Sequence, residues 1–173
     1  DSKALRPKQR ETIYDILRRD FAVSVVSIDA AGIDEARSRM SMNECVAELH
    51  AGALKELRPG LAYVDACDVN AERYGRTVAG YLDFPCDVVA EHRADARYKI
   101  VGAASVVAKV TRDRAIRDLD EEYGGIGSGY PSDPVTIEFL RRYIRDHGCP
   151  PPCARRSWKT VANLGQRTFA DFL

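Results

Sequence analysis

Apolar residues recur at a helical period in the middle of the chain. Between residues 91 and 115, four of them lie at i, i+3, i+4 and i+7: Ala103, Val106, Val107 and Val110. This spacing predicts a buried helix face, and the small residues around it favour close packing of the helix against a sheet. Asp95 lies just before this helix, at the edge of a rigid element, where a carboxylate can bind a metal ion or simply cap a turn.

Short runs of β-branched and apolar residues predict three strands, over residues 22–28, 61–65 and 86–90. Stretches with helical spacing separate these runs. Strands that alternate with helices are typical of an α/β layered structure. Three strands are few for so many helices, so we expect that the first strands of the sheet are missing from this chain.

Several polar residues stand where helices are expected to begin. Ser41 and Glu44 have the spacing of a capping box, in which each side chain bonds to the backbone N–H of the other residue. Asn70 can cap the helix that follows the second predicted strand. Asp133 can cap a later helix in the same way. Pro134 supports this helix start, because proline is favoured in the first turn of a helix.

The composition is that of an ordinary globular protein. The 173 residues include 26 basic and 26 acidic ones, and 45% are hydrophobic, which suffices for one folded core. The balanced charge gives no general attraction to nucleic acid, so such binding must come from local patches. No apolar run reaches the roughly 20 residues of a membrane span. The five cysteines are irregularly spaced, which argues against a disulfide framework and suits a reducing cytoplasm.

Asp65 ends a predicted strand whose preceding residues are apolar. A carboxylate at this position is costly to bury unless it is paired or binds a metal ion, although it can also cap the next loop. Asp65 and Asp95 both follow strands of the same predicted sheet, at the edge where α/β sheets build their sites. If the strands are neighbours, the two carboxylates can converge on a hard cation, for which oxygen ligands favour Mg²⁺ or Mn²⁺.

Basic residues gather in two parts of the chain. The first group consists of Lys3, Arg93, Arg97, Lys99, Lys109, Arg112 and Arg114, and the second of Arg155, Arg156 and Lys159 beside Trp158. Interleaved basic and aromatic residues fit a nucleic-acid backbone, although each residue alone is more typical of a solvated face. Tyr130 lies in a glycine-rich loop that a ligand can approach closely, so its ring can stack on a sugar or base, or anchor the loop.

Six short segments of the chain have distinctive sequences. They are DSK at residues 1–3, YVDACDVN at 63–70, HRADARY at 92–98, AASVVAKVTRDRA at 103–115, GSGYPSDP at 127–134 and RRSWKT at 155–160. Together they resemble type 2 ribonuclease H (ribonuclease HII) in its archaeal form. The resemblance implies a ribonuclease H-like fold, with a central mixed sheet flanked by helices. We place the catalytic core at residues 1–125 and a helical C-terminal region, with a substrate-binding loop, at 126–173.

The resemblance also implies an activity. Members of this family are endoribonucleases that cleave the RNA strand of RNA–DNA hybrids and incise 5′ of ribonucleotides embedded in duplex DNA, leaving 3′-hydroxyl and 5′-phosphate ends. Four carboxylates hold two divalent metal ions, Mg²⁺ or Mn²⁺, and Asp65 and Asp95 match two of them. Tyr130 matches the tyrosine that stacks on the sugar, and Lys3 falls where the family approaches the substrate backbone. Asp113 is a weaker candidate beside Asp95.

The family's other two carboxylates belong to a D-E-A-G-R-G segment, and we expect this chain to begin after it. Residues 32–39, GIDEARSR, resemble that segment superficially, but they follow DSK and lack the glycines of the motif. Asp34 and Glu35 are therefore expected to be solvated helix residues. Because half of the metal ligands are not found, an alternative is a non-catalytic module that binds hybrids or a sliding clamp.

The last eight residues, QRTFADFL, resemble the sliding-clamp-binding motif that ends archaeal members of the family. The matching positions are Gln166, Phe169, Phe172 and Leu173. A short terminal helix of this kind can dock into a groove of a partner, or pack on its own domain. The expected partners are thus an RNA–DNA hybrid, ribonucleotide-containing duplex DNA and a sliding clamp, bound by a monomer.

Overall fold

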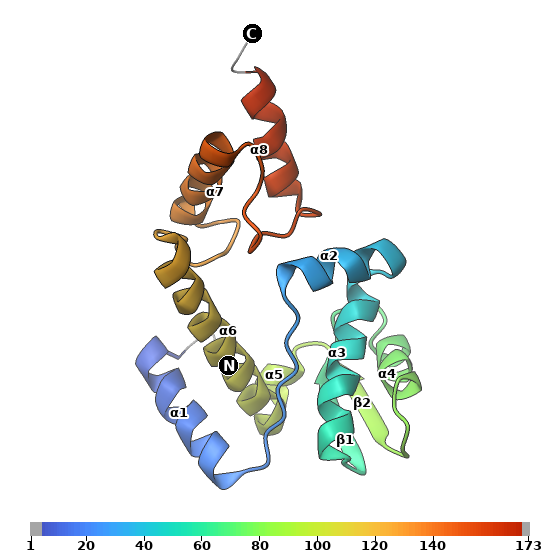
Figure 1. Cartoon of the computed structure of the whole chain (residues 1–173). Helices are drawn as coiled ribbons and strands as arrows, with labels where there is room; N and C mark the ends of the chain where they lie inside the picture. The colour runs from blue at the N-terminus through green and yellow to red at the C-terminus, as the bar shows by residue number, and fades with distance from the viewer. Residues whose placement is uncertain (1–4, 171–173) are drawn as a thin grey trace. The chain divides into compact units, whose positions relative to one another are not determined.

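The computed structural model describes the backbone of residues 5–170 and the side chains as far as residue 165 (Figure 1). The chain forms two compact units. One comprises Asp1–Ser27 with Met40–Thr111, and the other comprises Ile28–Arg39 with Arg112–Leu173. The division therefore falls within the long helix α6 (Lys99–Tyr123), upstream of the boundary that we predicted at residue 125.

A parallel sheet lies at the centre of the first unit. Among the described residues it has two strands, β1 (Leu61–Asp65) and β2 (Asp87–Glu91), and its register places Asp65 opposite Glu91. Helix α4 (Ala71–Gly80) belongs to the crossover that two parallel strands require. The predicted α/β class and two of the three predicted strands are confirmed, and the second strand begins and ends one residue later than predicted.

The prediction of a strand over residues 22–28 is wrong. These residues form neither helix nor strand, and Val26 packs instead against α3 (Met42–Leu57), where a Cβ atom added to Gly52 would lie 3.3 Å from Val26 Cγ2. The valines and isoleucine of this segment favour strand geometry, but a strand also needs a neighbour that pairs with its backbone. Within the described part of the chain, only β1 and β2 pair in this way.

The predicted helix caps are confirmed. Ser41 Oγ accepts a hydrogen bond from Glu44 N at 3.2 Å, and Glu44 Oε2 accepts one from Ser41 N at 2.8 Å, which completes the capping box of α3. Asn70 caps α4, and Asp133 caps α7. The other described helices are α1 (Pro7–Asp20), α2 (Ala30–Arg39), α5 (Ala94–Arg97), α7 (Pro134–His147) and α8 (Lys159–Ala170). None of the helices in the described range is long and apolar enough to cross a membrane.

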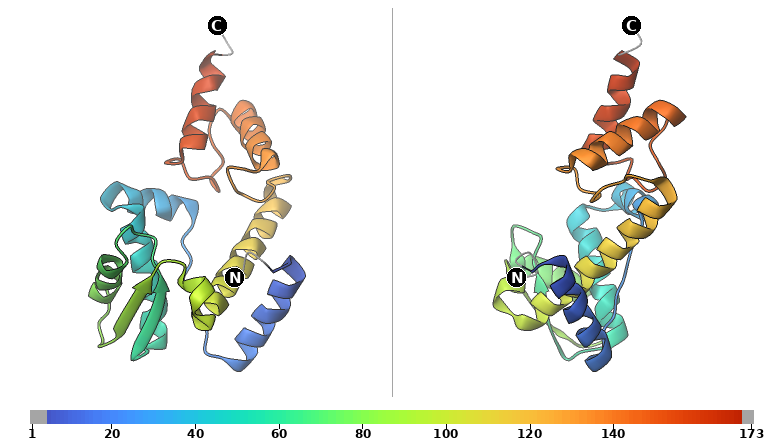
Figure 2. Two further views of the ribbon diagram at one scale, coloured as in Figure 1. Left: turned by 180° about the vertical axis from the view of Figure 1, so that it is seen from behind. Right: turned by 90° about the vertical axis from the view of Figure 1, so that its left-hand side faces the viewer.

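The core of the first unit lies between the sheet and the helices α3 and α4 (Figure 2). Its buried members are Ala47, Ala51, Val64, Tyr74 and Val78. The Tyr74 hydroxyl and His50 Nδ1 form a hydrogen bond of 3.0 Å inside this core, which satisfies both polar groups. Burial lowers the pKa of His50 against the opposing charge of Asp65, and burial also raises the pKa of Tyr74, so both side chains are neutral at pH 7.

The core of the second unit joins α7 and α8. Its buried members are Ile126, Phe139, Leu140 and Val161, and Trp158 packs against them. Helix α7 ends at Gly148, which takes the left-handed conformation (φ 71°) that glycine adopts readily. All five cysteines of the chain are free thiols, as their irregular spacing predicted.

Gly75 allows α4 to approach the sheet closely. A Cβ atom at this position would lie 3.2 Å from Ala90 Cβ and 3.3 Å from Val88 O. Because both neighbours belong to β2, the contact cannot relax by rotation of a flexible side chain. We therefore expect Gly75→Val to lower the free energy of unfolding by about 1–3 kcal/mol, as overpacking usually does. Urea unfolding followed by circular dichroism measures this change.

Gly80→Val is the matched control. Gly80 ends the same helix, and no atom lies within 4 Å of its added Cβ. This variant should change the free energy of unfolding by less than about 0.5 kcal/mol. Equal destabilisation by the two substitutions would show that valine in α4, and not the contact with β2, is responsible.

Candidate active site

Asp65 stands at the carboxyl end of β1 and contacts the backbone beside Asp95. Its Oδ1 accepts a hydrogen bond from the N–H of Ala94 at 3.0 Å. Ala94 is 1% exposed and begins the short helix α5, in whose first turn Asp95 lies. Asp95 was predicted to lie just before the long small-residue helix, and it belongs instead to the short helix α5, which precedes α6. The structure thus brings the Asp65 carboxylate and the Asp95 backbone together in the first unit.

The backbone around Asp95 is fixed from two sides. On one side, the ladder of the sheet continues past β1, because Ala66 N donates to Glu91 O at 2.9 Å. The chain then reverses at Arg93, which takes a left-handed conformation (φ 56°) that is uncommon for a residue with a side chain. On the other side, α6 packs so closely that a Cβ atom on Gly102 would lie 3.0 Å from Asp95 O.

Glu91 is a neighbour of this site that the sequence did not suggest. It lies opposite Asp65 in the register, and its carboxylate accepts a hydrogen bond from the Tyr98 hydroxyl at 2.8 Å and pairs with Arg97. The hydrogen bond to Glu91 raises the pKa of Tyr98, whose ring lies 4.4 Å from that of Tyr63. Glu91 therefore ties the end of α5 to the sheet. Extending the third predicted strand, residues 86–90, by one residue would have placed Glu91 opposite Asp65.

The donors at this site fit a hard divalent cation in kind. Asp65 and Asp95 offer carboxylate oxygens, which Mg²⁺ and Mn²⁺ prefer. Among the side chains described, those of residues 5–165, no group of three or more His, Cys, Asp or Glu is placed to hold a metal ion. Two carboxylates can supply only part of the six or more oxygens that such an ion takes, and water or a phosphate group can supply the others.

Tyr130 lies in the second unit, on a loop that several interactions hold. Asp133 accepts hydrogen bonds from Ser128 N at 2.6 Å, Ser128 Oγ at 2.7 Å and Val135 N at 2.9 Å. The hydrogen bonds from Ser128, followed by that from Val135, lower the pKa of Asp133 to about 2. Arg112 lies over the Tyr130 ring, 3.9 Å from its centroid, and donates to Ser128 O at 2.7 Å. The ring is held in place yet remains 46% exposed.

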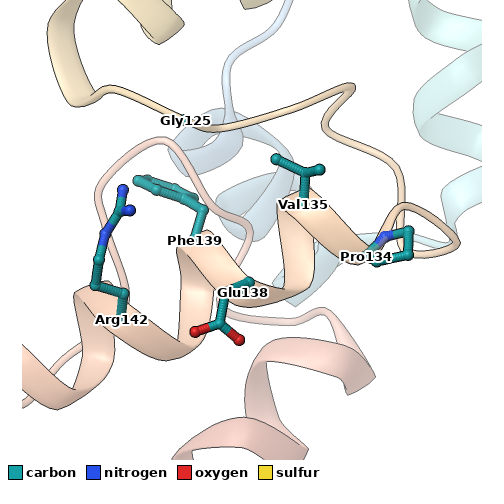
Figure 3. Close-up of a pocket in the computed structure, with 6 residues that line it drawn as sticks. All are labelled: Gly125, Pro134, Val135, Glu138, Phe139 and Arg142. Carbon is teal, nitrogen blue, oxygen red and sulfur yellow. The ribbon is translucent and has the colours of Figure 1, made fainter.

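A pocket lies beside this loop, and one of its lining residues helps to hold the loop in place (Figure 3). Its lining residues are Gly125, Pro134, Val135, Glu138, Phe139 and Arg142. In Figure 3, the side chains of Phe139 and Arg142 extend toward the loop segment at Gly125. The side chain of Glu138 extends away from this segment. Arg142 donates to Gly124 O at 2.7 Å. The pocket therefore contains a residue that anchors the loop, and it includes none of the predicted catalytic residues.

Asp34 lies on α2, as expected of a helix residue, but its carboxylate also holds a distant segment of the chain. Its carboxylate is half-buried and accepts hydrogen bonds from Arg156 and Ser157 of the second basic group. Burial raises the pKa of Asp34, but the hydrogen bonds from Ser157 and Arg156 outweigh it and hold the pKa below its usual range. Glu35 is exposed and pairs with Arg39 within α2, as expected of a solvated helix residue.

Several of the other predicted residues fall outside the part of the chain that the structure describes. Lys3 lies outside the described residues, and so do Phe172 and Leu173. Gln166 and Phe169 lie on α8, whose side chains are described only as far as residue 165. Asp65 and Asp95 belong to the first unit and Tyr130 to the second, so the roles assigned to these residues remain predictions.

Comparisons with known proteins point in one direction. The model of a family described as Ribonuclease HII matches residues 1–161. Ribonuclease HII of Methanoregula boonei is 55% identical over 164 residues, which cover 95% of this chain and 77% of that protein. Ribonuclease HII of Methanospirillum hungatei is 52% identical over 176 residues, which cover 99% of this chain and 83% of that protein.

Solved structures resemble the whole described chain. The crystal structure of ribonuclease H2 from Pyrococcus horikoshii matches 96% of this chain and 80% of its own, with 43% identity and a TM-score of 0.88. The ribonuclease HII of Archaeoglobus fulgidus, solved as a complex with PCNA, matches 99% of this chain and 82% of its own, with 41% identity and the same TM-score of 0.88.

Asp133→Asn tests whether a charged carboxylate holds the Tyr130 loop. The variant should unfold at a lower urea concentration at pH 7, because asparagine offers one acceptor oxygen to donors that now use two. The pKa is about 2 in the folded chain against 3.8 ordinarily, so this stabilisation is present above pH 3.8 and is lost as the pH falls through 2. The difference between wild type and variant should therefore shrink between pH 4 and pH 2.

Asp146→Asn is the control for this measurement. Asp146 is exposed near the other end of α7, the helix that Asp133 caps, and it pairs only with its neighbour Arg145 among the contacts described, at 3.0 Å. Its substitution should leave the urea midpoint near that of the wild type. A shift as large as that of Asp133→Asn would contradict a specific role for Asp133.

Proposed function

Because the chain belongs to the ribonuclease HII family, we propose that it incises duplexes 5′ of an embedded ribonucleotide by two-metal-ion hydrolysis. Members of this family are endonucleases that hydrolyse the RNA strand of RNA–DNA hybrids. The observation that supports the finer proposal is the hydrogen bond between Asp65 and Ala94. This bond holds the carboxylate at the end of β1 against the N–H of Ala94, the residue directly before the second predicted ligand, Asp95.

Asp65 and Asp95 would hold the metal ions, which are Mg²⁺ or Mn²⁺ in this proposal. Bound there, the ions would lower the pKa of the attacking water and stabilise charge on the leaving oxygen. Water adds to phosphorus, the bond from phosphorus to the 3′ oxygen breaks, and that oxygen takes up a proton. The products are a 3′-hydroxyl and a 5′-phosphate on the fragment that begins with the ribonucleotide.

The protein contributes positioning to this reaction. The N–H of Ala94 orients the Asp65 carboxylate, and Gly102 lets α6 support the backbone of Asp95. Ligands fixed by such contacts need little rearrangement when the substrate binds. Tyr130 is proposed to stack on the sugar beside the ribonucleotide, because its ring is both held and exposed. Lys3 is proposed to contact the substrate backbone.

Substitution of either predicted ligand tests the proposal. In the full-length protein, Asp65→Asn and Asp95→Asn should each abolish incision of a duplex that contains one ribonucleotide, with Mg²⁺ or Mn²⁺ present. The loss should exceed the roughly 10–100-fold that removal of an outer-shell partner costs, because a ligand is itself removed. Gel analysis of end-labelled duplexes measures the rate and identifies the incised bond.

Asp87→Asn is the matched control, because Asp87 is exposed at the opposite end of the same sheet, across from Leu61. It should incise at a rate close to that of the wild type. Near-normal incision by Asp65→Asn would overturn the assignment. A wild-type protein that binds hybrids but cleaves neither substrate would instead support the alternative of a non-catalytic binding module.

We also propose that the C-terminal tail binds a sliding clamp. The structure of the Archaeoglobus fulgidus ribonuclease HII was solved in complex with PCNA, and this chain resembles that enzyme over 99% of its length. The tail carries Gln166, Phe169, Phe172 and Leu173 at the spacing expected of a clamp-binding motif. The predicted interaction is a short terminal helix that inserts apolar residues into a groove of the clamp.

The double substitution Phe172→Ala with Leu173→Ala should weaken clamp binding by about tenfold or more, because buried apolar anchors dominate such interfaces. Calorimetric titration of the full-length protein with an archaeal sliding clamp measures the affinity. Thr168→Ala lies in the same tail outside the motif and should bind as the wild type does. Equal affinity of all three proteins would show that the clamp does not use these residues.

A further inference from the structure

A carboxylate on α2 holds the turn that carries the second basic group. Asp34 Oδ2 accepts a hydrogen bond from the backbone N–H of Arg156 at 2.7 Å. Asp34 Oδ1 accepts two more, from the backbone N–H of Ser157 at 3.1 Å and from its hydroxyl at 2.5 Å. The partners lie 122 and 123 residues apart in the sequence, within one compact unit. Three donors on one carboxylate fix both the position and the orientation of the turn.

The turn is also fixed on its other side. The N–H of Trp158 donates to Arg155 O at 3.1 Å, and the N–H of Ala162 donates to Trp158 O at 3.0 Å, so the turn leads directly into α8. Trp158 packs against the hydrophobic core of the second unit, and the Arg155 guanidinium lies 5.4 Å from its ring centroid. Anchored in this way, the turn leaves the side chains of Arg156 and Lys159 exposed.

Asp34 carries a negative charge although the turn that it holds carries basic side chains. Burial opposes ionisation of Asp34, but the hydrogen bonds from Ser157 and Arg156 and the charge of Arg155 keep its pKa low, so the group is ionised at neutral pH. By charge alone, a carboxylate beside two exposed cations weakens their attraction for an anion. A carboxylate at this position is explained if ordering the turn strengthens anion binding more than the added negative charge weakens it.

We propose that Asp34 is a positioning residue that directs Arg156 and Lys159 toward the phosphates of a nucleic-acid duplex. Phosphate contacts of this kind set the register and orientation of a protein on a duplex without reading its sequence. The inference rests on the proposed function, because that function supplies the duplex. Asp34 itself makes no contact with the substrate in this arrangement, and it acts through the turn.

Removal of the carboxylate distinguishes positioning from simple electrostatics, because the two predict opposite signs. If Asp34 positions the turn, Asp34→Ala weakens binding of an RNA–DNA hybrid by about three- to tenfold. If Asp34 only adds negative charge, the same variant binds the hybrid more tightly. Fluorescence anisotropy of a labelled hybrid, without divalent metal, measures the dissociation constant independently of cleavage.

Glu35→Ala is the matched control. Glu35 lies one residue away on the same helix, carries the same charge and pairs with Arg39 on α2 at 3.2 Å. Its substitution should leave affinity for the hybrid unchanged or raise it slightly. Ser157→Ala removes one of the three donors while keeping Asp34, and it should weaken binding by less than Asp34→Ala does. Thermal unfolding of each variant confirms that the proteins compared are folded.

The salt dependence of binding supplies a second readout that a merely structural role would not change. Arg156→Gln should reduce the slope of the logarithm of the binding constant against the logarithm of salt concentration by about one, as loss of one phosphate contact does. Asp34→Ala should reduce the slope similarly. In the Arg156→Gln background, Asp34→Ala should then cost much less than it does alone, because part of what it positions is already absent.

The failures of the two proposals are distinguishable. Hybrid binding that Asp34→Ala leaves unchanged or strengthens, or effects of Asp34→Ala and Arg156→Gln that simply add, would overturn the positioning role while incision continues. Failure of the wild-type protein to incise any duplex would overturn the proposed function, whereas the binding measurements on Asp34 would still give a result.

Discussion

The hydrogen bond from Ala94 N to Asp65 Oδ1 is the contact on which the candidate active site depends. Parallel strands have their carboxyl ends at the same edge of a sheet, so the chain leaving β1 and the chain leaving β2 begin side by side. Asp65 uses this proximity, because a strand-end carboxylate can reach the first free N–H of the next helix. Together with the sheet ladder beyond β1 and the close packing of α6, this contact fixes the orientation of α5 and the position of the Asp95 backbone.

The interior behind β1 supports the same edge. Gly75 allows α4 to lie against β2, and the hydrogen-bonded pair of His50 and Tyr74 fills the space between α3 and α4 without leaving a buried polar group unpaired. Both side chains are neutral at pH 7, because burial lowers the pKa of His50 and raises that of Tyr74. The sheet edge is therefore backed by a core that adds no competing charge.

Local sequence signals predicted the parts of the fold that local chemistry decides. Capping residues such as Ser41 and Asn70 marked helix starts correctly, because a cap and its donors lie within a few residues of each other. The segment 22–28 was predicted wrongly as a strand. Its β-branched residues favour strand geometry, but a strand forms only where a distant segment pairs with its backbone. The contacts of Glu91 and Asp34 were not foreseen for the same reason: they are set by strand register and by an interaction across 122 residues.

Asp34, Asp65 and Asp133 each accept hydrogen bonds from backbone N–H groups, and they differ in which carboxylate oxygens accept them. Asp34 and Asp133 each use both carboxylate oxygens on the segment that they hold. A metal ion at either residue would compete with donors that already engage both oxygens. In Asp65 the N–H of Ala94 engages Oδ1. A carboxylate that anchors a helix through one oxygen can orient the other toward a cation, which favours Asp65 over Asp34 and Asp133 as a metal ligand.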